Sequence, residues 1–513
     1  MLTKFINVTA NRFRILILFL NNKKESAVTY DFFYGRYLFL KFLAIIYFVA
    51  FGSLFLQIDG LYSSTGITPI IDYIALIKNH FQDVPFLKFP TIFAWFNSDF
   101  FINSIGLLGI LLSIIAFFYI GSWPILALLW LLYLSFTSVG QAFLSFQWDI
   151  LLLEVGFLAL FLCSFDIRKQ CHDQPVNRWV IWAFRILLFR LMFGSGVVKL
   201  FSGDPTWLSF TALTYHYYTQ PLPHIGGWIM HQLPNWLHRL SVFIMFVIEL
   251  LFPWLILVPF SFARKVCFYG IVLLMAMIIL TGNYCFFNFL TISLCIFLLK
   301  DSDLAFFSWF KNRVPIKSGP LKNRSLYLIG LPCLISAVII LLGLNLELAR
   351  FYPTLSLRHI SSISTQIMSF RIVNTYGLFA NMTTQRYEIE ISGSFDGKHW
   401  EPYQFKYKPN DTTSFPGWVQ PYHPRLDWQM WFAALGHYKH NDWYIKLLVR
   451  LLHNESSVLN LLQTNPFQQK PPTYIRATRY RYQFTTVKQF LDTGEFWVKD
   501  YKGLYSPPIT LTK

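Results

Sequence analysis

Six charged side chains stand inside or at the ends of long apolar runs of this chain, where an unpaired charge is costly. They are Asp149, Glu154, Arg185, Arg190, Lys199 and Glu249. One interpretation is structural: the two Glu side chains neutralise Arg185 and Arg190, and the ion pairs hold neighbouring helices together. The other is chemical: these groups line a polar cavity that opens outward, with Lys199 and Asp204 at its mouth. Both interpretations remain open at this point.

Histidines in the segment after Lys199 form a second group of candidates. His216 is followed by His224, His231 and His238, and these last three are spaced seven residues apart. Ligands two helical turns apart would share one face of a helix, but prolines such as Pro234 interrupt any continuous helix here. We therefore expect no metal site in this segment. We expect none at His423, His437 and His440 either, because no Cys lies nearby.

The common sequence signatures of catalysis are missing. We find no phosphate-binding loop, no paired CxxC motif and no G-x-S-x-G nucleophile elbow. The cysteines are Cys163, Cys171, Cys267, Cys285, Cys295 and Cys333, so none follows residue 333. The C-terminal part of the chain therefore cannot carry out thiol–disulfide exchange with its own residues. If it helps another protein to fold, it does so by binding or by recruiting a separate oxidoreductase.

The composition indicates which elements must hold these residues. Of 513 residues, 55% are hydrophobic and only 13% are charged, about half the roughly 25% that soluble domains carry. The mean hydropathy is +0.44. These values exclude a soluble enzyme, and six Cys in 513 residues are too few for a disulfide-stapled secreted protein. The net charge of +17 would suggest nucleic acid for a soluble chain, but in a membrane protein such an excess sets the orientation, so we expect no nucleic-acid partner.

Long apolar runs predict about nine membrane-spanning helices. They lie near residues 37–57, 102–120, 123–139, 144–165, 179–201, 240–260, 266–282, 284–300 and 326–346. Basic residues gather before the first run and after the fourth, sixth and eighth, which places the N-terminus in the cytoplasm. We therefore expect a basic cytoplasmic segment over 1–36, a polytopic membrane domain over 37–346 with an outward loop at 203–238, and an outward-facing domain over 347–513.

The C-terminal segment has the pattern of an α+β domain. Residues 387–395 alternate as a strand, Asp396-Gly397 predicts a turn, and 399–407 predicts the returning strand. Residues 425–435 and 443–452 have helical patterns, and 473–487 predicts another strand. The expected fold class is thus an α-helical polytopic membrane protein with a C-terminal extramembrane α+β domain.

At several of these segments the chain resembles the lipase maturation factor family. The resemblance is carried by VAFGSLFLQIDGLYSSTGITP (49–69), SFQWDILLLEVGFLALFL (145–162), FRLMFGSGVVKLFSGDPTW (189–207), NTYGLFANMTTQRYEIEISGSFDGKHW (374–400) and QPYHPRLDWQMWFAALG (420–436). It implies a non-enzymatic membrane chaperone without a cofactor, which assists an exported client such as a lipase on the outward or lumenal side. The Lys-, Asn-, Phe- and Ile-rich composition favours a bacterial inner membrane; a eukaryotic member would lie in the endoplasmic reticulum membrane.

For such a chaperone, the motif after Pro424 is the expected client surface, because Trp and Arg dominate binding hot spots. Its residues are Arg425, Leu426, Asp427, Trp428, Gln429, Trp431 and Phe432. The alternative is that this segment is a helix packed on the bilayer or on the membrane domain.

A more distant resemblance suggests an enzyme. The stretch GSGVVKLFSGDPTW (194–207) is similar to the lysine-bearing region of vitamin K-dependent γ-carboxylases. That resemblance implies Lys199 as a base at a quinol-type or lipid cofactor, with His216 or Asp204 assisting. The structural alternative is that Lys199 extends to the membrane interface.

Overall fold

The computed structural model describes residues 28–29, 31–163, 176–304, 326–352, 354 and 367–511. Many of the basic residues from which the sequence predicts the membrane orientation lie outside the described residues. This holds for Lys4, Arg12, Arg14, Lys23 and Lys24, for Arg168 and Lys169, and for Lys311, Arg313, Lys317, Lys322 and Arg324, as it does for Cys171.

Within the described residues, six helices are long and apolar enough to cross a membrane. They are α2 (Phe33–Phe55), α5 (Asp99–Phe118), α8 (Arg178–Phe201), Asn235–Ile256, α13 (Ser261–Thr281) and Gly330–Phe351 of α17 (Leu326–Phe351). The Asn235–Ile256 span begins as α12 (Asn235–Phe246) and continues through a π-helical turn at Val247–Leu251 and a 3-10 turn at Phe252–Ile256. The chain is thus a polytopic membrane protein.

The expected count of about nine spans is too high for the described residues. The three other apolar runs form shorter helices, namely α6 (Trp123–Val139), α7 (Gln147–Ala159) and α14 (Phe287–Cys295) with its 3-10 extension to Leu298. Asp149, Glu154 and most other residues of α7 are buried inside the protein. The run around α7 is therefore apolar because protein surrounds it, and not because lipid does.

Short helices connect the spans. They are α3 (Ile58–Tyr62), α4 (Ile70–Phe81), α9 (Pro205–Leu208), α10 (Ala212–Thr219), α11 (Ile225–His231) and α15 (Asp301–Leu304). Helix α15 contacts the start of α2, because the Asp301 carboxylate accepts hydrogen bonds from the backbone N–H groups of Phe33 and Tyr34. A two-residue strand pair, β1 (Val28–Thr29) with β2 (Val176–Asn177), lies before α2 and α8.

The C-terminal region is built on one antiparallel sheet with the strand order β4-β3-β7-β8. Its strands are β4 (Glu401–Pro402), β3 (Arg386–Ser394), β7 (Tyr474–Phe484) and β8 (Trp497–Ile509). A second pair joins β5 (Gln404–Phe405) to β6 (Leu462–Thr464). The helices are α19 (Arg425–Ala434), α20 (Asp442–Leu452), α21 (Ser456–Leu459) and α22 (Val487–Thr493). The strands expected near 387–395 and 473–487 are confirmed, and so are both helices.

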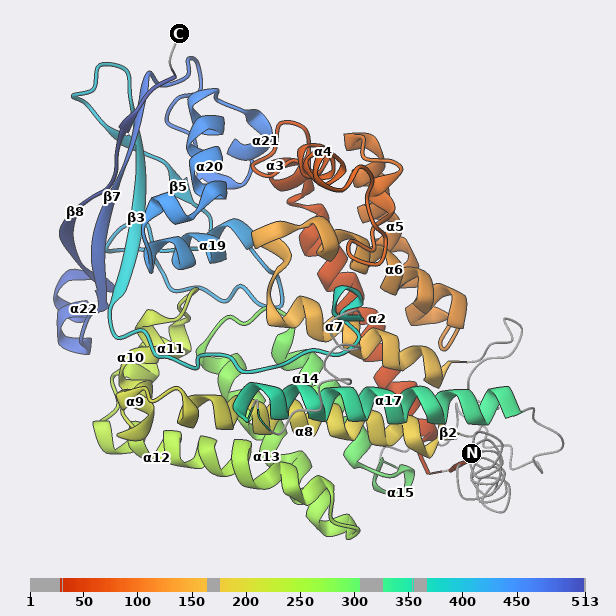
Figure 1. Cartoon of the computed structure of the whole chain (residues 1–513). Helices are drawn as coiled ribbons and strands as arrows, with labels where there is room; N and C mark the ends of the chain where they lie inside the picture. Colours follow the sequence, from red (N-terminus) through yellow and green to blue (C-terminus); the bar gives the residue numbers. More distant parts are fainter. Residues whose placement is uncertain are drawn as a thin grey trace.

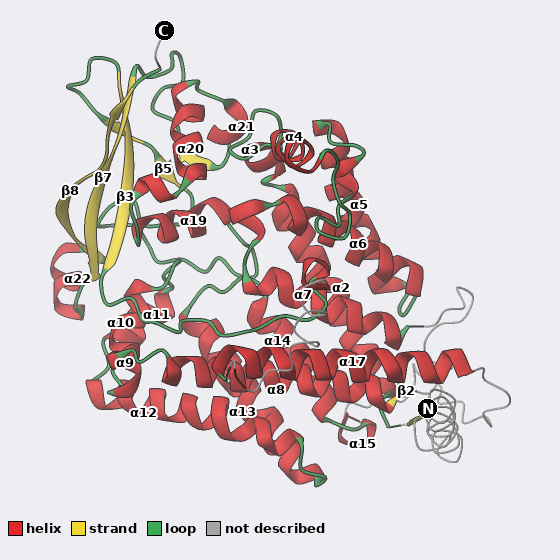
Figure 2. Cartoon of the chain, in the orientation of Figure 1, coloured by secondary structure: helices red, strands yellow, loops and turns green. Residues whose placement is uncertain are grey.

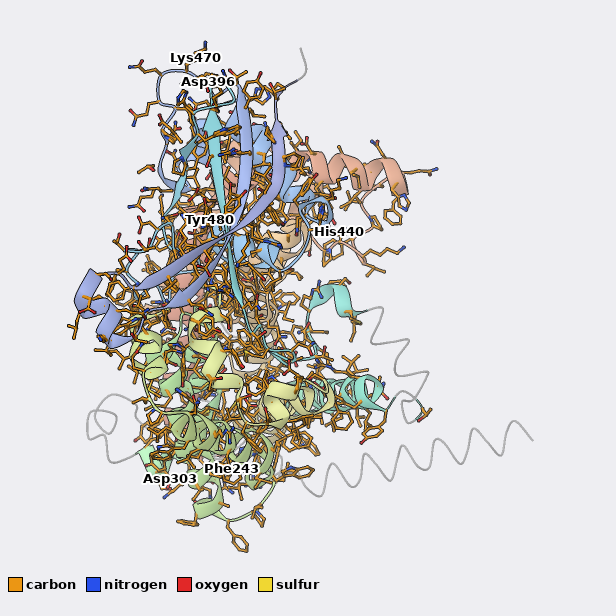
Figure 3. The ribbon with its side chains drawn as sticks, turned by 90° about the vertical axis from the view of Figure 1, so that its left-hand side faces the viewer. Phe243, Asp303, Asp396, His440, Lys470 and Tyr480 are labelled. Carbon is orange, nitrogen blue, oxygen red and sulfur yellow. The ribbon has the colours of Figure 1, made fainter. Side chains whose placement is uncertain are left out.

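The sheet and the spans occupy different parts of the molecule. Figure 1 shows the β3, β7 and β8 strands and α20 at one corner, and α8, α12, α13 and α17 along the opposite edge. Figure 2 shows that the long strands are confined to that corner. In Figure 3, Asp396 and Lys470 lie at the tip of the sheet, whereas Phe243 of α12 lies at the other end, where it is 54% exposed. α19 and α7 lie between these two parts in Figure 1.

Candidate functional site

The first carboxylate of α7, Asp149, forms an ion pair with a residue of the C-terminal region. Arg425 donates from Nη2 to Oδ1 of Asp149 at 3.0 Å and from Nη1 to Oδ2 at 3.1 Å. Tyr133 also donates to Asp149, and Arg425 reaches the Phe143 carbonyl at 2.6 Å. Both charged side chains are fully buried. The Asp149 carboxylate raises the pKa of Arg425 above its usual range despite burial, so the guanidinium stays charged.

The second carboxylate of α7, Glu154, binds a neighbouring span and the segment that enters the C-terminal region. Arg190 of α8 donates to Oε1 of Glu154 at 2.9 Å. The other oxygen accepts from Tyr376 Oη at 2.8 Å and from the backbone N and Nδ2 of Asn374 at 2.9 and 3.0 Å. The expected Glu154–Arg190 pair is present. One short helix therefore supplies both acidic partners that hold residues 374–376 and 425 onto the membrane domain.

The expected client surface is mostly buried at this contact. Arg425, Asp427, Trp428 and Trp431 are each at most 7% exposed, Leu426 and Gln429 are buried as well, and only Phe432 is exposed, at 43%. Trp431 donates from Nε1 to the Thr219 carbonyl at 2.7 Å. This arrangement matches the alternative of a helix packed on the membrane domain. The correction has a physical reason: packing of Trp428 against Phe146, Trp148 and Tyr284 removes its apolar surface from water.

Two buried groups, Asp427 in α19 and His423 just before it, have shifted pKa values. Burial raises the pKa of Asp427 to about 6, although its carboxylate accepts backbone N–H groups from Tyr407 and Lys408 at 2.9 and 3.0 Å. Burial and the nearby Arg425 charge lower the pKa of His423 well below its usual range. The neutral His423 accepts at Nδ1 from Nε1 of Trp148 at 3.2 Å. His423 is thus a buried packing residue.

A separate ion pair, Lys199–Glu249, faces a cavity between the spans. Nζ of Lys199 lies 2.9 and 2.7 Å from the two carboxylate oxygens of Glu249 and 3.1 Å from the Ser195 carbonyl. These three bonds use all three donors of the ammonium group, so the geometry is that of an ion pair and not of a free amine base. Glu249 stands in the π-helical turn of the Asn235–Ile256 span, and such turns are frequent at functional sites.

The cavity beside this pair has a volume of about 390 Å³ and lies mainly between α8, α12, α13, α14 and α10. Its wall is largely apolar. Glu154 and Arg190 do not line it, so the six charges do not share one polar cavity. Asp149, Glu154 and the Lys199–Glu249 pair belong to three separate ion pairs, and Arg185 lies apart from all three. The structure thus brings Lys199 and Glu249 to the cavity and leaves the α7 carboxylates at the contact with the C-terminal region.

Arg185 pairs with none of the expected Glu side chains. Its Nε donates to the Phe297 carbonyl at 2.9 Å, and its guanidinium lies over the rings of Phe32 and Trp182, 5.3 and 5.2 Å from their centroids. Backbone and aromatic partners replace the carboxylate that we had assigned to it.

The two residues expected to assist Lys199 have different places. His216 lines the cavity, and its Nε2 lies 2.8 Å from Oη of Tyr284. Asp204 instead caps α9 through the N–H of Thr206 at 2.8 Å, and its other oxygen accepts from the N–H of Met382 at 2.8 Å. Asp204 is absent from the cavity wall, so the three residues do not converge on one site.

The remaining histidines of residues 203–238 pack inside the protein. His224 and His238 are buried, and the His231 ring packs against Tyr218, with 5.3 Å between centroids. Among the described residues, no three His, Cys, Asp or Glu side chains are grouped so that they could hold a metal ion.

Several residues at these contacts were not singled out from the sequence. They are Tyr133, Tyr284, Asn283, Asn288, Asn374 and Tyr376. Asn374 and Tyr376 stand in the NTYGLF stretch of one quoted motif, so the motif was the available signal. Asn283 accepts from the N–H of Val419 at 2.8 Å and donates to the Gly417 carbonyl at 2.9 Å, a partnership across more than a hundred residues that no local pattern indicates.

Comparison with known proteins matches two family models. Residues 34–306 match the lipase maturation factor transmembrane domain, and residues 372–507 match the lipase maturation factor C-terminal domain. The chain is 36% identical to lipase maturation factor 2 of Xenopus laevis, over 90% of this chain and 80% of that protein. It is 34% identical to human lipase maturation factor 1, over 94% of this chain and 89% of that protein. No solved structure matches the chain. These comparisons give no support to the carboxylase-like alternative.

Proposed function

The chain belongs to the lipase maturation factor family, and from this premise we propose that it assists the maturation of an exported lipase on the outward side of its membrane. It is an integral membrane maturation factor; the lipase client and the side of the membrane are the proposed parts. The observation that supports them most is the double attachment of the C-terminal region to α7 through Asp149 and Glu154. Because both contacts are buried, this region is held in a fixed position beside the membrane, where an exported chain would meet it.

We place the client contact on the exposed end of α19 and not on its buried face. Phe432 is 43% exposed and Leu435, which follows the helix, is 47% exposed. Neighbouring exposed apolar side chains are a common mark of a binding surface. In this proposal Arg425, Asp427, Trp428 and Trp431 position the helix, and Phe432 contacts the client.

The orientation follows from the distribution of positive charge. Basic residues gather in the N-terminal segment and in alternate loops, which supports a cytoplasmic N-terminus and an outward C-terminal region. We propose a bacterial inner membrane, with the endoplasmic reticulum membrane for a eukaryotic host. Because no Cys follows residue 333, any disulfide formed in the client would require a separate oxidoreductase as a further partner.

The test uses cells that lack their own member of this family. A secreted lipase is produced there with and without this chain, and the activity per unit of secreted lipase is measured. We expect the chain to raise that specific activity. If no tested lipase responds while the chain accumulates normally in the membrane, the proposed client class is wrong.

A surface variant tests the client contact. Phe432→Asp with Leu435→Asp should abolish most of the gain in lipase activity, because charges replace both apolar contacts. The matched control is Leu491→Asp on α22, which replaces a side chain that is 76% exposed elsewhere on the C-terminal region. The control should retain the gain. Equal activity of both variants, at equal membrane levels, would contradict this placement of the client surface.

A further inference from the structure

The cavity beside Lys199 and Glu249 is lined by apolar side chains that could bind a hydrocarbon chain. Its volume of about 390 Å³ is within the range of roughly 300–1,000 Å³ that small-molecule sites occupy. Five of the nine methionines of the chain line it: Met192, Met230, Met245, Met275 and Met277. Methionine side chains are flexible and polarizable and adapt to irregular apolar shapes. The five methionines therefore favour a flexible apolar ligand.

The apolar surface of the spans marks where the cavity opens. Leu273 and Met277 line it from α13 and are 54% and 48% exposed, and Ile244 lines it from α12 and is 46% exposed. On α13 they belong to a stripe with Tyr269 and Leu280, whose spacing places all four on one helix face. Phe243, labelled in Figure 3, lies next to Ile244 on the outer surface of α12. Since both helices belong to candidate spans, the opening between them faces lipid.

The cavity carries no net charge from its ion pair. Among its lining residues, Lys199 and Glu249 neutralise each other, and burial together with the nearby Lys199 charge lowers the pKa of His216 to about 4. A phosphate or an ionised carboxylate would need a surplus cation, as binding sites for these groups usually supply. The lining residues therefore favour a neutral ligand.

Two polar atoms at the cavity remain without a partner in the described chain. Gln220 donates through Nε2 to the carbonyls of Tyr217 and Thr281, so its Oε1 accepts from Tyr284 Oη at 3.0 Å. Because the Tyr284 hydroxyl donates there, it accepts from Nε2–H of His216, which leaves Nδ1 of His216 as a bare acceptor. Nδ2 of Asn288 also has no partner, and this residue is 1% exposed. Buried polar groups usually have hydrogen bonds, so this acceptor and this donor point to a ligand.

We propose that the cavity binds a neutral glycerolipid with a free hydroxyl, a mono- or diacylglycerol, whose acyl chain enters from the bilayer between α12 and α13. Its hydroxyl donates to Nδ1 of His216, and its ester carbonyl accepts from the amide of Asn288. Monoacylglycerol places its single chain in the cavity; diacylglycerol leaves its second chain in the bilayer at the opening. This site is independent of the client, and nothing in the proposed maturation role requires it.

Photo-crosslinking of the full chain in detergent micelles tests the proposal. The probe is a monoacylglycerol with a diazirine in its acyl chain, and the comparison probes are a phosphatidylglycerol and a fatty acid with the same chain. We expect the monoacylglycerol to label peptides of α8, α12 and α13, and unlabelled monoacylglycerol to compete. Equal labelling of these peptides by the phosphatidylglycerol or the ionised fatty acid would overturn the assignment to a neutral glycerolipid. Labelling that no excess of monoacylglycerol reduces would overturn the site.

Variants separate the cavity from the outer surface. Met245→Trp fills the cavity and should reduce labelling to background, whereas Leu251→Trp, at a position that is 61% exposed and outside the lining, should leave labelling unchanged. Asn288→Leu and His216→Phe should each lower labelling by about 2- to 10-fold, as expected for the loss of one hydrogen bond. If a variant fails to fold, the competition experiment on the unaltered chain still decides the question. Because lipase activity is not the readout, failure here leaves the maturation role untouched.

Discussion

At the scale of single residues, the buried pair Asp149–Arg425 is one of the contacts that hold the C-terminal region on the membrane domain. Both side chains are fully buried, so removal of one partner leaves an uncompensated charge away from water. We expect Arg425→Met to lower the free energy of unfolding by about 3–5 kcal/mol. Thermal unfolding in detergent, together with the protease resistance of the C-terminal region, measures this effect.

Two further variants serve as controls for that pair. Asp149→Leu combined with Arg425→Met should recover much of the loss, because no unpaired charge remains. Arg481→Met breaks a partly exposed pair with Asp500 and should cost less than about 1 kcal/mol. If Arg425→Met were as mild as Arg481→Met, the buried pair would not be what holds the two regions together.

Asp427 should make stability depend on pH. Its pKa in the folded protein is raised to about 6 by burial, above the value of about 3.9 in an unfolded chain. Between pH 4 and 6 the unfolded chain releases this proton while the folded protein keeps it, so the contribution of the protonated form to stability is lost as the pH rises. Relative to Asp427→Asn, the wild type should therefore lose up to about 3 kcal/mol across this window.

Thermal unfolding of both proteins at pH 4, 5, 6 and 7 checks this prediction. The difference between wild type and Asp427→Asn at pH 4, where the carboxyl is protonated in both states, is the internal reference. A difference that stays constant up to pH 7 would mean that the two backbone N–H groups of Tyr407 and Lys408 compensate the buried charge completely.

Residue types revealed which side chains needed partners, but not which partners they have. The sequence predicts that Glu154 and Glu249 neutralise Arg185 and Arg190, and of these pairings the structure contains Glu154 with Arg190. Asp149 and Arg425 were assigned to different sites, since 276 positions separate them and no local pattern connects two such residues. Glu249 was predicted to need a cation, but Lys199 and not an Arg provides it.

At the scale of elements, close packing of α2 and α5 depends on small residues. A Cβ atom at Gly109 of α5 would lie 2.3 Å from Cδ1 of Phe51 on α2, whereas one at Gly52 of α2 would meet nothing within 4 Å. Gly109→Ala should therefore destabilise the protein by about 1–3 kcal/mol through overpacking. Gly52→Ala should be neutral or stabilise by up to about 1 kcal/mol through helix propensity.

The thermal unfolding midpoints of these two alanine variants in one detergent provide the comparison. Both variants add the same methyl group to a membrane-spanning helix, so a difference between them reports the packing environment alone. Equal midpoints would show that Phe51 moves aside without cost.

The strands β3 and β7 form where the sequence predicts them, although seven of the nine residues of β3 are buried and its burial does not alternate. The sequence does not predict β8, because Gly503, Pro507 and Pro508 argue against a strand. β8 lies at the edge of the sheet, and its register with β7 shifts at several points, which is where proline is tolerated. α7 was predicted as a span because an apolar run does not tell a protein-buried helix from a lipid-exposed one.

At the scale of the whole molecule, the orientation can be tested with the chain's own glycosylation motifs. Asn381 of the Asn381-Met-Thr motif is exposed and lies in the C-terminal region, whereas Asn7-Val-Thr lies in the N-terminal segment. In a eukaryotic secretory host, we expect a glycan at Asn381 and none at Asn7, because the transferase acts only on the lumenal side. The electrophoretic shift after glycosidase treatment of wild type, Asn381→Gln and Asn7→Gln measures this. A shift that Asn7→Gln removes would reverse the proposed orientation.

The attachment of residues 374–376 and 425 to α7 has a consequence for how the protein is made. α7 emerges from the ribosome more than two hundred residues before its partners, so the nascent membrane domain carries two buried carboxylates, one of which waits for Arg425. The membrane domain therefore reaches its final state only after the C-terminal region has been synthesised and has docked on α7. A chain that stops before residue 372 would leave Asp149 without its partner Arg425. Completion of the membrane domain thus depends on the part of the same chain that is made last.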